Sequence, residues 1–341
     1  MERPHPACGQ RNGGPARPSR WRQRLNRRVF GNNRARKSPE ACLSLSICKF
    51  PLETSPLSRY CEDVQVISII NQKGGVGKTT ASVNIAAALA ASGVRSLIVD
   101  LDPQAHLSIS LDRLPEPGAP SVYTLMSGTH SVEEVVQSTA QENLFVAPTN
   151  LDLTGAETEF ASEIGRESIL RDALKKFSKS KMAPEVVILD CPPSLGLLSL
   201  NALVCSQYVI IPLQAEFFAL QGMAQLLDVV ERVKRRLNPG LDLLGILVSM
   251  FQKQRNLSRE VLDELHSHFG DLVFKTLVRV NVRLAEAPSH GQTIYEYAPE
   301  SAGADDFAAL AGEVAHRLGL VKTEEPQTQA PVEPLAEMEA G

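Results

Sequence analysis

The chain lacks two features that would place it in common functional classes. No apolar run approaches the roughly 18 residues of a membrane-spanning helix, which argues against a membrane protein. The six cysteines include no pair with the C-x₂-C spacing of typical metal ligands, so thiols in a reducing compartment are the simpler interpretation. Function therefore has to be sought in other motifs.

Positive charge is scarce outside the first 60 residues. Those residues hold thirteen Lys/Arg against three Asp/Glu, and the rest of the chain holds 22 against 36, which leaves the body with a net charge of −14. An acidic body binds nucleic acid only through a local basic patch.

The two ends of the chain differ in composition from the part between them. Residues 1–62 are rich in Pro, Gly, Ser and Arg without a sustained apolar period, which predicts a disordered basic extension. Three interpretations stay open: a plain basic arm or a non-native upstream start, an arm that contacts DNA, and an organellar targeting segment. Residues 321–341 are rich in Pro, Glu and Gln and predict an acidic disordered tail, so residues 63–320 form the expected domain.

The most specific motif is a glycine-rich loop with the sequence Asn71-Gln72-Lys73-Gly74-Gly75-Val76-Gly77-Lys78-Thr79-Thr80. An apolar, β-branched run over 64–70 precedes it and an alanine-rich stretch follows, which is the strand, loop and helix order of a phosphate-binding loop. Its glycines let backbone N–H groups and the helix N-terminus point at one anion. Lys78 can then reach the β- and γ-phosphates, and the Thr79 hydroxyl is placed to ligate Mg²⁺.

This loop departs from the common pattern in two places. Gln72 occupies the position where a glycine is usual, and a second lysine, Lys73, lies inside the loop. Two lysines so close in sequence would repel each other on one set of phosphates. We therefore expect Lys73 to reach into the site of another subunit, which predicts a homodimer with nucleotide sandwiched between its subunits.

From residue 64 onward, apolar strand patterns alternate with helical patterns. This alternation predicts an α/β fold, a doubly wound and mostly parallel sheet with helices on both faces. The expected strands are 64–70, 94–100, 143–148, 186–190, 208–213, 243–250 and 273–280, and the expected helices are 81–91, 164–178, 196–206, 219–237 and 257–269.

Three aspartates stand at the predicted carboxyl ends of strands. Asp100 and Asp102 follow one strand, and Asp190 ends another before Cys191-Pro192-Pro193. Ligands of such sheets bind at this edge, where the phosphate loop also opens. The pattern predicts that Asp190 holds the metal through water and that Asp102 orients the attacking water.

Four motifs in this order resemble those of the ParA/Soj chromosome- and plasmid-partitioning ATPases, a deviant Walker A class of P-loop proteins. The resemblance covers about 64–320. The motifs are Lys73-Gly74-Gly75-Val76-Gly77-Lys78-Thr79-Thr80, Val99-Asp100-Leu101-Asp102-Pro103-Gln104, Leu189-Asp190-Cys191-Pro192-Pro193-Ser194-Leu195-Gly196, and Asn281-Val282-Arg283-Leu284-Ala285-Glu286-Ala287-Pro288-Ser289-His290-Gly291.

The resemblance implies an Mg²⁺-dependent ATPase with ATP as its cofactor. Lys73, Lys78 and Asp102 are then the catalytic residues, and Thr79, Asp102 and Asp190 the metal site. It further implies ATP-sandwiched homodimers that bind DNA without sequence preference, and slow hydrolysis stimulated by a ParB-type centromere-binding protein. The expected location is the cytoplasm, in association with the nucleoid.

Some positions depart from the family pattern. The family's Asp-Pro-Gln-Gly-Asn is Asp102-Pro103-Gln104-Ala105-His106 here, which stiffens the turn. A basic position used for DNA contact is Gln254, and the proline-arginine pair before Asn281 is Arg279-Val280. The candidate DNA contacts are Lys253, Arg255, Arg279 and Arg283. The basic run 232–236 is either a further contact or the solvated end of a helix.

Two related functions remain open. A MinD-like membrane-cycling regulator would need a basic amphipathic C-terminal helix, which the acidic tail does not provide. A ParA-like factor that positions a protein cargo shares all four motifs, so the cargo is not defined by this sequence.

Overall fold

A seven-stranded sheet forms the centre of the computed structural model, which describes residues 64–180 and 182–320. The strand order is β3-β4-β2-β5-β1-β6-β7, and every neighbouring pair is parallel except the short β3–β4 edge. The strands are β1 (Gln65–Ile69), β2 (Ser96–Asp100), β3 (Gln137–Ser138), β4 (Leu144–Ala147), β5 (Val186–Asp190), β6 (Tyr208–Gln214) and β7 (Asp242–Ser249). The predicted fold class is confirmed.

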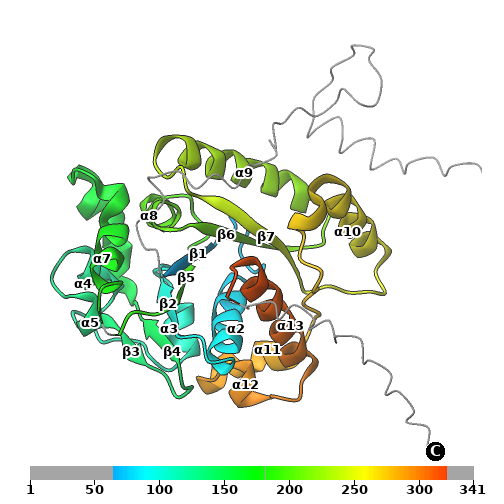
Figure 1. Cartoon of the computed structure of the whole chain (residues 1–341), viewed down its shortest axis with the longest axis horizontal. Helices are drawn as coiled ribbons and strands as arrows, with labels where there is room; N and C mark the ends of the chain where they lie inside the picture. Colours follow the sequence, from blue (N-terminus) through cyan, green and yellow to red (C-terminus); the bar gives the residue numbers. More distant parts are fainter. Residues whose placement is uncertain (1–63, 181, 321–341) are drawn as a thin grey trace, which may run out of the picture. The chain divides into compact units, whose positions relative to one another are not determined.

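Helices cover both faces of this sheet (Figure 1). On one face, α2 (Lys78–Ala91) lies against the central strands, with α13 (Ala302–Arg317) packed outside it. On the other face lie α7 (Ile169–Phe177), α8 (Leu197–Cys205), α9 (Ala219–Arg236) and α10 (Asn256–Phe269). Every residue of β2 and β5 is buried, because both faces are covered, and this explains their continuous apolar sequences.

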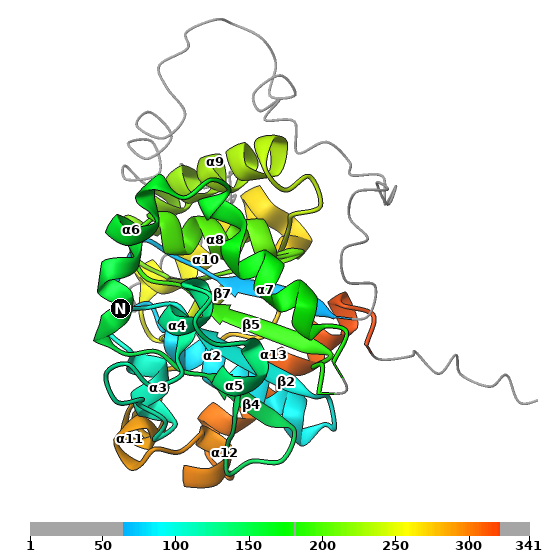
Figure 2. The same ribbon diagram turned by 90° about the vertical axis from the view of Figure 1, so that its left-hand side faces the viewer.

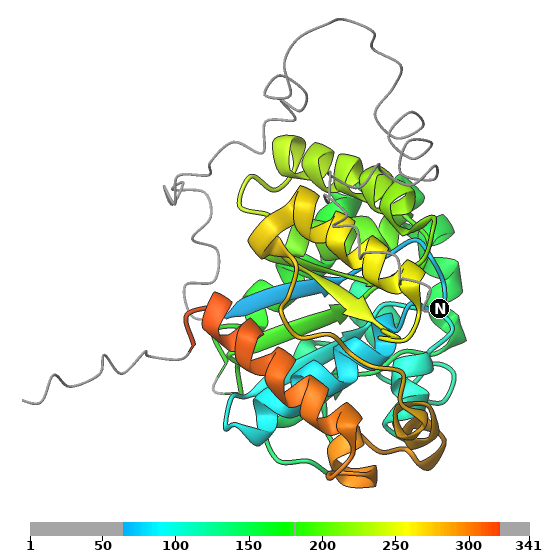
Figure 3. The ribbon, with the colours of Figure 1, turned by 90° about the vertical axis from the view of Figure 1, so that its right-hand side faces the viewer.

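The alanine content of α2 follows from its position between two layers. It packs against the sheet on one side and against α13 on the other, so every residue from Ala81 to Ala90 is buried. Small side chains let these layers approach closely. Figure 3 shows α13 running along α2.

Shorter helices connect these elements. They are α3 (His106–Ser110), α4 (Val122–Met126), α5 (Val132–Val135), α6 (Ala156–Glu159), α11 (Val282–Glu286) and α12 (Ile294–Tyr297), with 3₁₀ turns η2 (Leu151–Gly155), η3 (Phe160–Ser162), η4 (Arg166–Ser168), η5 (Gly270–Leu272) and η6 (Ala287–His290). The helix expected over 164–178 is divided into η4 and α7.

The strand expected over 273–280 is wrong. This segment runs beside β7 but makes only isolated bridges, between Ile246 and Val273 and between Phe251 and Arg279. The physical reason is a carboxylate: Glu313 of α13 accepts hydrogen bonds from the backbone N–H groups of Lys275, at 2.9 Å, and Thr276, at 2.7 Å. Those amides are therefore not available to a ladder.

The expectations for residues 1–62 and 321–341 lie outside the described residues. Within 64–180 and 182–320, no helix has both the length and the apolarity to cross a membrane.

Candidate nucleotide site

The glycine-rich loop lies at the carboxyl edge of the sheet, between the end of β1 and the start of α2. Gly75 and Gly77 have φ values of 72° and 84°, which residues with a Cβ rarely adopt. Gly77 directly precedes α2, so the N-terminus of a buried 14-residue helix faces this edge. Gly74 and Gly75 are exposed, Val76 is buried, and Thr80 is half-buried in the first turn of α2.

Two polar residues at the ends of β6 and β7 hold the loop from the side. The Ser249 hydroxyl lies 2.7 Å from the Val76 carbonyl oxygen, and Gln214 Nε2 donates to the Gly75 carbonyl at 3.0 Å. Sequence reasoning missed both residues. The available signal was a polar residue at the carboxyl end of an otherwise apolar strand.

Asp190 is positioned by the first two turns of α2. Thr79 Oγ1 donates to one carboxylate oxygen at 2.7 Å, and Ser82 Oγ donates to the other at 2.9 Å. Burial raises the pKa of Asp190 to about 6, although these hydrogen bonds and the charge of Lys78 lower it. Lys78 is itself buried at the start of α2. The sequence-predicted Lys78, Thr79 and Asp190 are thus brought together.

A hydroxyl and a carboxylate at one position fit a Mg²⁺ ion that takes its other ligands from phosphates and water. Among the described residues, no group of three or more His, Cys, Asp or Glu side chains could hold a metal alone. The donor set therefore suits metal bound with a nucleotide rather than a closed protein cage.

Asp100 anchors the loop that carries Asp102. It lies opposite Asp190 in the sheet register and is fully buried. Its carboxylate accepts from the Ser108 N–H at 2.9 Å, the Ser108 hydroxyl at 2.7 Å and the Asp102 N–H at 3.2 Å. Burial, reinforced by the charge of Asp190, raises the pKa of Asp100 to about 8. This buried anchor places the half-buried Asp102 at the rim of the site.

Ala105 has an uncommon backbone conformation in this loop. Its φ of 56° and ψ of 27° are left-handed, and it caps the N-terminus of α3. The ParA/Soj pattern has glycine here, and the left-handed conformation explains that preference.

Lys73 lies in the exposed part of the phosphate loop. Its ammonium group forms an ion pair with Glu216, which follows β6, and the two side chains are 54% and 49% exposed. Its backbone N–H donates to Asn71 Oδ1 at 3.0 Å.

The four candidate DNA contacts have different surroundings. Lys253 and Arg255 are exposed in the loop between β7 and α10. Arg283 lies on α11 and donates to Glu286 at 2.9 Å. Arg279 is bound to Asp306 of α13 through several hydrogen bonds. Figure 2 shows α3, which follows the Asp102 loop, near α11.

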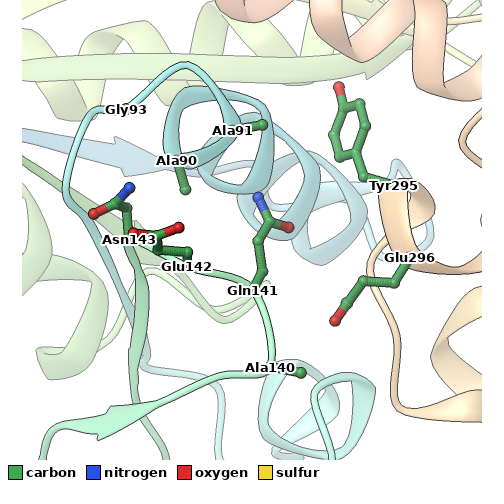
Figure 4. Close-up of a pocket in the computed structure, with 9 residues that line it drawn as sticks. All are labelled: Ala90, Ala91, Gly93, Ala140, Gln141, Glu142, Asn143, Tyr295 and Glu296. Carbon is green, nitrogen blue, oxygen red and sulfur yellow. The ribbon is translucent and has the colours of Figure 1, made fainter.

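A hollow of about 330 Å³ lies at the opposite edge of the sheet (Figure 4). It is bounded by the C-terminal end of α2, the turn before β4 and α12, and Gln141, Glu142 and Glu296 contribute polar side chains. Because Gly93 and Asn143 precede β2 and β4, this hollow is remote from the phosphate loop and is not part of the candidate site.

Comparison with known proteins agrees with this geometry. A family model described as an AAA domain matches residues 64–243. The chain is 44% identical over 251 residues to the sporulation initiation inhibitor protein Soj of Bacillus subtilis, covering 74% of this chain and 98% of that protein. It is 45% identical over 255 residues to the chromosome-partitioning ATPase Soj of Thermus thermophilus, covering 75% and 97%.

A solved structure is similar as well. It is named as the cobyrinic acid a,c-diamide synthase of Mycobacterium smegmatis with bound ADP and magnesium, and it is 34% identical with a TM-score of 0.64, covering 75% of this chain and 96% of that one. The motifs, the sheet order and these relatives agree: the chain belongs to the Soj/ParA family of chromosome-partitioning ATPases.

Proposed function

We propose that this partitioning ATPase is an ATP-switched DNA tether that dimerises around its nucleotide. The observation that carries the proposal is the joining of Thr79, at the start of α2, to Asp190, at the end of β5, by a 2.7 Å hydrogen bond. That contact brings together a hydroxyl and a carboxylate, groups that suit Mg²⁺, at the edge where the phosphate loop opens, and so supports the binding of MgATP there.

Each loop residue has a distinct part in holding MgATP. The backbone from Gly74 to Thr80 surrounds the phosphates, and the buried Lys78 neutralises part of their charge. Thr79 would bind the metal directly and Asp190 would hold it through water. A bound Mg²⁺ would supply positive charge that neutralises part of the negative charge of the phosphates.

Asp102 acts in hydrolysis. Its backbone N–H is tied to the buried Asp100, and its own carboxylate accepts from the Gln104 N–H at 3.0 Å. A carboxylate held in this way at the rim of the site can orient a water molecule and the metal's hydration shell.

The dimer and the DNA surface extend this function beyond one subunit. Lys73 crosses to the nucleotide of the partner subunit, which its exposed position permits. Lys253, Arg255 and Arg283 bind phosphates of non-specific DNA, a role that needs charge more than base contacts. A ParB-type centromere-binding protein stimulates hydrolysis and release, and the protein works in the cytoplasm on the nucleoid.

Binding to labelled duplex DNA of arbitrary sequence tests this proposal. We expect binding with MgATP and much weaker binding with MgADP, with affinity falling steeply as salt rises. Equal affinity in the two nucleotide states would contradict the switch.

A further inference from the structure

The Arg279–Asp306 pair is more than a surface ion pair. The Arg279 backbone N–H donates to Asp306 at 2.9 Å, Nε donates to both carboxylate oxygens at 3.0 Å, and Nη2 donates to Oδ1 at 2.7 Å. Nη2 also donates to the Ala302 carbonyl at 3.2 Å. The Asp306 side chain is only 10% exposed, whereas the Arg279 side chain is 52% exposed, so the carboxylate is fixed in the fold and the guanidinium lies at its surface.

The pair lies between the two basic elements of the proposed DNA surface. On one side, Phe251 exchanges backbone hydrogen bonds with the residues that flank Arg279, and the loop that carries Lys253 and Arg255 follows directly. On the other side, Asn281 caps α11 by accepting from the Arg283 N–H at 2.8 Å. Arg279 thus lies between the backbone contact to Phe251, which precedes the loop of Lys253 and Arg255, and the start of α11.

Helix α13 is a firm support for this junction. Glu313, two turns after Asp306, binds the backbone N–H groups of Lys275 and Thr276. A Cβ at Gly303 would lie 2.8 Å from Leu284 of α11, so the two helices are in close contact. Carboxylates of α13 therefore hold the backbone that leads into α11 at two places.

We propose that Arg279 and Asp306 are positioning residues for DNA binding, which fix α11 and the 251–255 loop relative to each other so that Arg283, Lys253 and Arg255 meet one DNA backbone. Nε and Nη2 of Arg279, one of the two edges of the guanidinium that can hold a phosphate by two hydrogen bonds, both face Asp306. The inference rests on the proposed DNA binding and gives Arg279 a role through its neighbours rather than as a phosphate ligand.

The decisive comparison uses two neighbouring aspartates in the full chain with MgATP. Asp306→Asn and Asp305→Asn remove the same charge from adjacent positions, but only Asp306 is buried against Arg279, whereas Asp305 is exposed. If acidic charge alone mattered, both variants would bind labelled duplex more tightly. Positioning predicts that Asp306→Asn binds about tenfold more weakly, or ~1.4 kcal/mol, whereas Asp305→Asn binds at least as well as the parent.

Two further measurements separate positioning from loss of structure and from direct contact. The slope of log affinity against log salt should fall by about one in Asp306→Asn, because a phosphate contact is lost, while MgATP affinity stays unchanged. Arg279→Lys keeps the positive charge but loses the paired guanidinium donors that bind Asp306, so it should weaken DNA binding as Asp306→Asn does.

The outcomes are distinguishable. Equal DNA affinity of Asp306→Asn and Asp305→Asn, or parent-like binding by Arg279→Lys, would overturn the positioning role alone. A parent protein that does not bind duplex with MgATP would overturn the proposed function and this inference with it.

Discussion

At the scale of single residues, Ala105 is one of four non-glycine residues with positive φ in the part of the chain that the structure describes, the others being Asp112, Asn143 and Met250. A left-handed residue with a Cβ costs about 1–2 kcal/mol, which glycine would remove, although the greater freedom of glycine in the unfolded chain offsets part of this gain. We predict that Ala105→Gly stabilises the protein by about 1 kcal/mol and raises Tm by about 2–4 °C in thermal unfolding.

A matched control is available for this substitution. Ala308 is exposed in the middle of α13, where glycine has no conformational advantage. Ala308→Gly should therefore lower Tm by a similar amount. If both variants lowered Tm, the conformation of Ala105 would not be a source of strain.

The buried aspartates give the protein a predictable pH dependence. The pKa of Asp100 rises from its ordinary value of 3.8 to about 8 on folding, and that of Asp190 rises to about 6. Between the ordinary pKa and the raised pKa of each aspartate, the folded state binds more protons than the unfolded state. The contribution of the two aspartates to stability is therefore complete below about pH 4 and is lost as pH rises towards 8.

This contribution can be isolated in the nucleotide-free protein. We predict that Tm falls by several degrees between pH 5 and 8. Asp100→Asn should make this fall shallower, because asparagine carries no charge and still accepts from the Ser108 N–H. Asp305→Asn, on an exposed position, should leave the fall as it is. Parallel curves for the parent and Asp100→Asn would argue against a buried proton at Asp100.

At the scale of elements, the sequence was most informative where burial is uniform. Apart from Ser96 at the start of β2, the strands β2 and β5 are apolar up to a terminal acid. Both are predicted to within two residues, because buried parallel strands require that pattern. Because the carboxyl ends of parallel strands meet at the ligand-binding edge of the sheet, the terminal residues Asp100 and Asp190 are predicted to lie there too.

Long-range contacts explain what was not predicted. The segment 273–280 has the apolar content of a strand, but its amides are bound by Glu313, 37 residues after Thr276. Likewise, Gln214 and Ser249 hold the phosphate loop from strands 139 and 173 residues away. No local pattern contains these pairings. Helix α13, by contrast, was missed although Ser301 caps it and Phe307, Leu310 and Val314 follow at helical spacing.

At the scale of the whole molecule, the open question is whether Lys73 completes a second subunit's site. In one subunit its partner is Glu216, and both side chains are about half exposed. Exposed ion pairs contribute little to stability, so Lys73 can leave Glu216 at small cost for a nucleotide that carries several negative charges. The pair therefore favours an exchange of partners on dimerisation.

This exchange makes a prediction for two opposite substitutions. In an Asp102→Ala background, which the proposed role of Asp102 predicts to slow hydrolysis, Lys73→Gln with MgATP should weaken dimerisation at least about tenfold in sedimentation equilibrium. The expected reason is the loss of a charge contact across the interface. Glu216→Gln should leave dimerisation equal or tighter, since it removes the competing partner. Both variants should bind ATP as monomers with parent affinity, because Lys78 and Thr79 are intact. If Lys73→Gln lost nucleotide binding along with dimerisation, Lys73 would bind the phosphates of its own subunit. If the Lys73→Gln dimer were as stable as the parent dimer, Lys73 would have no part in a shared site.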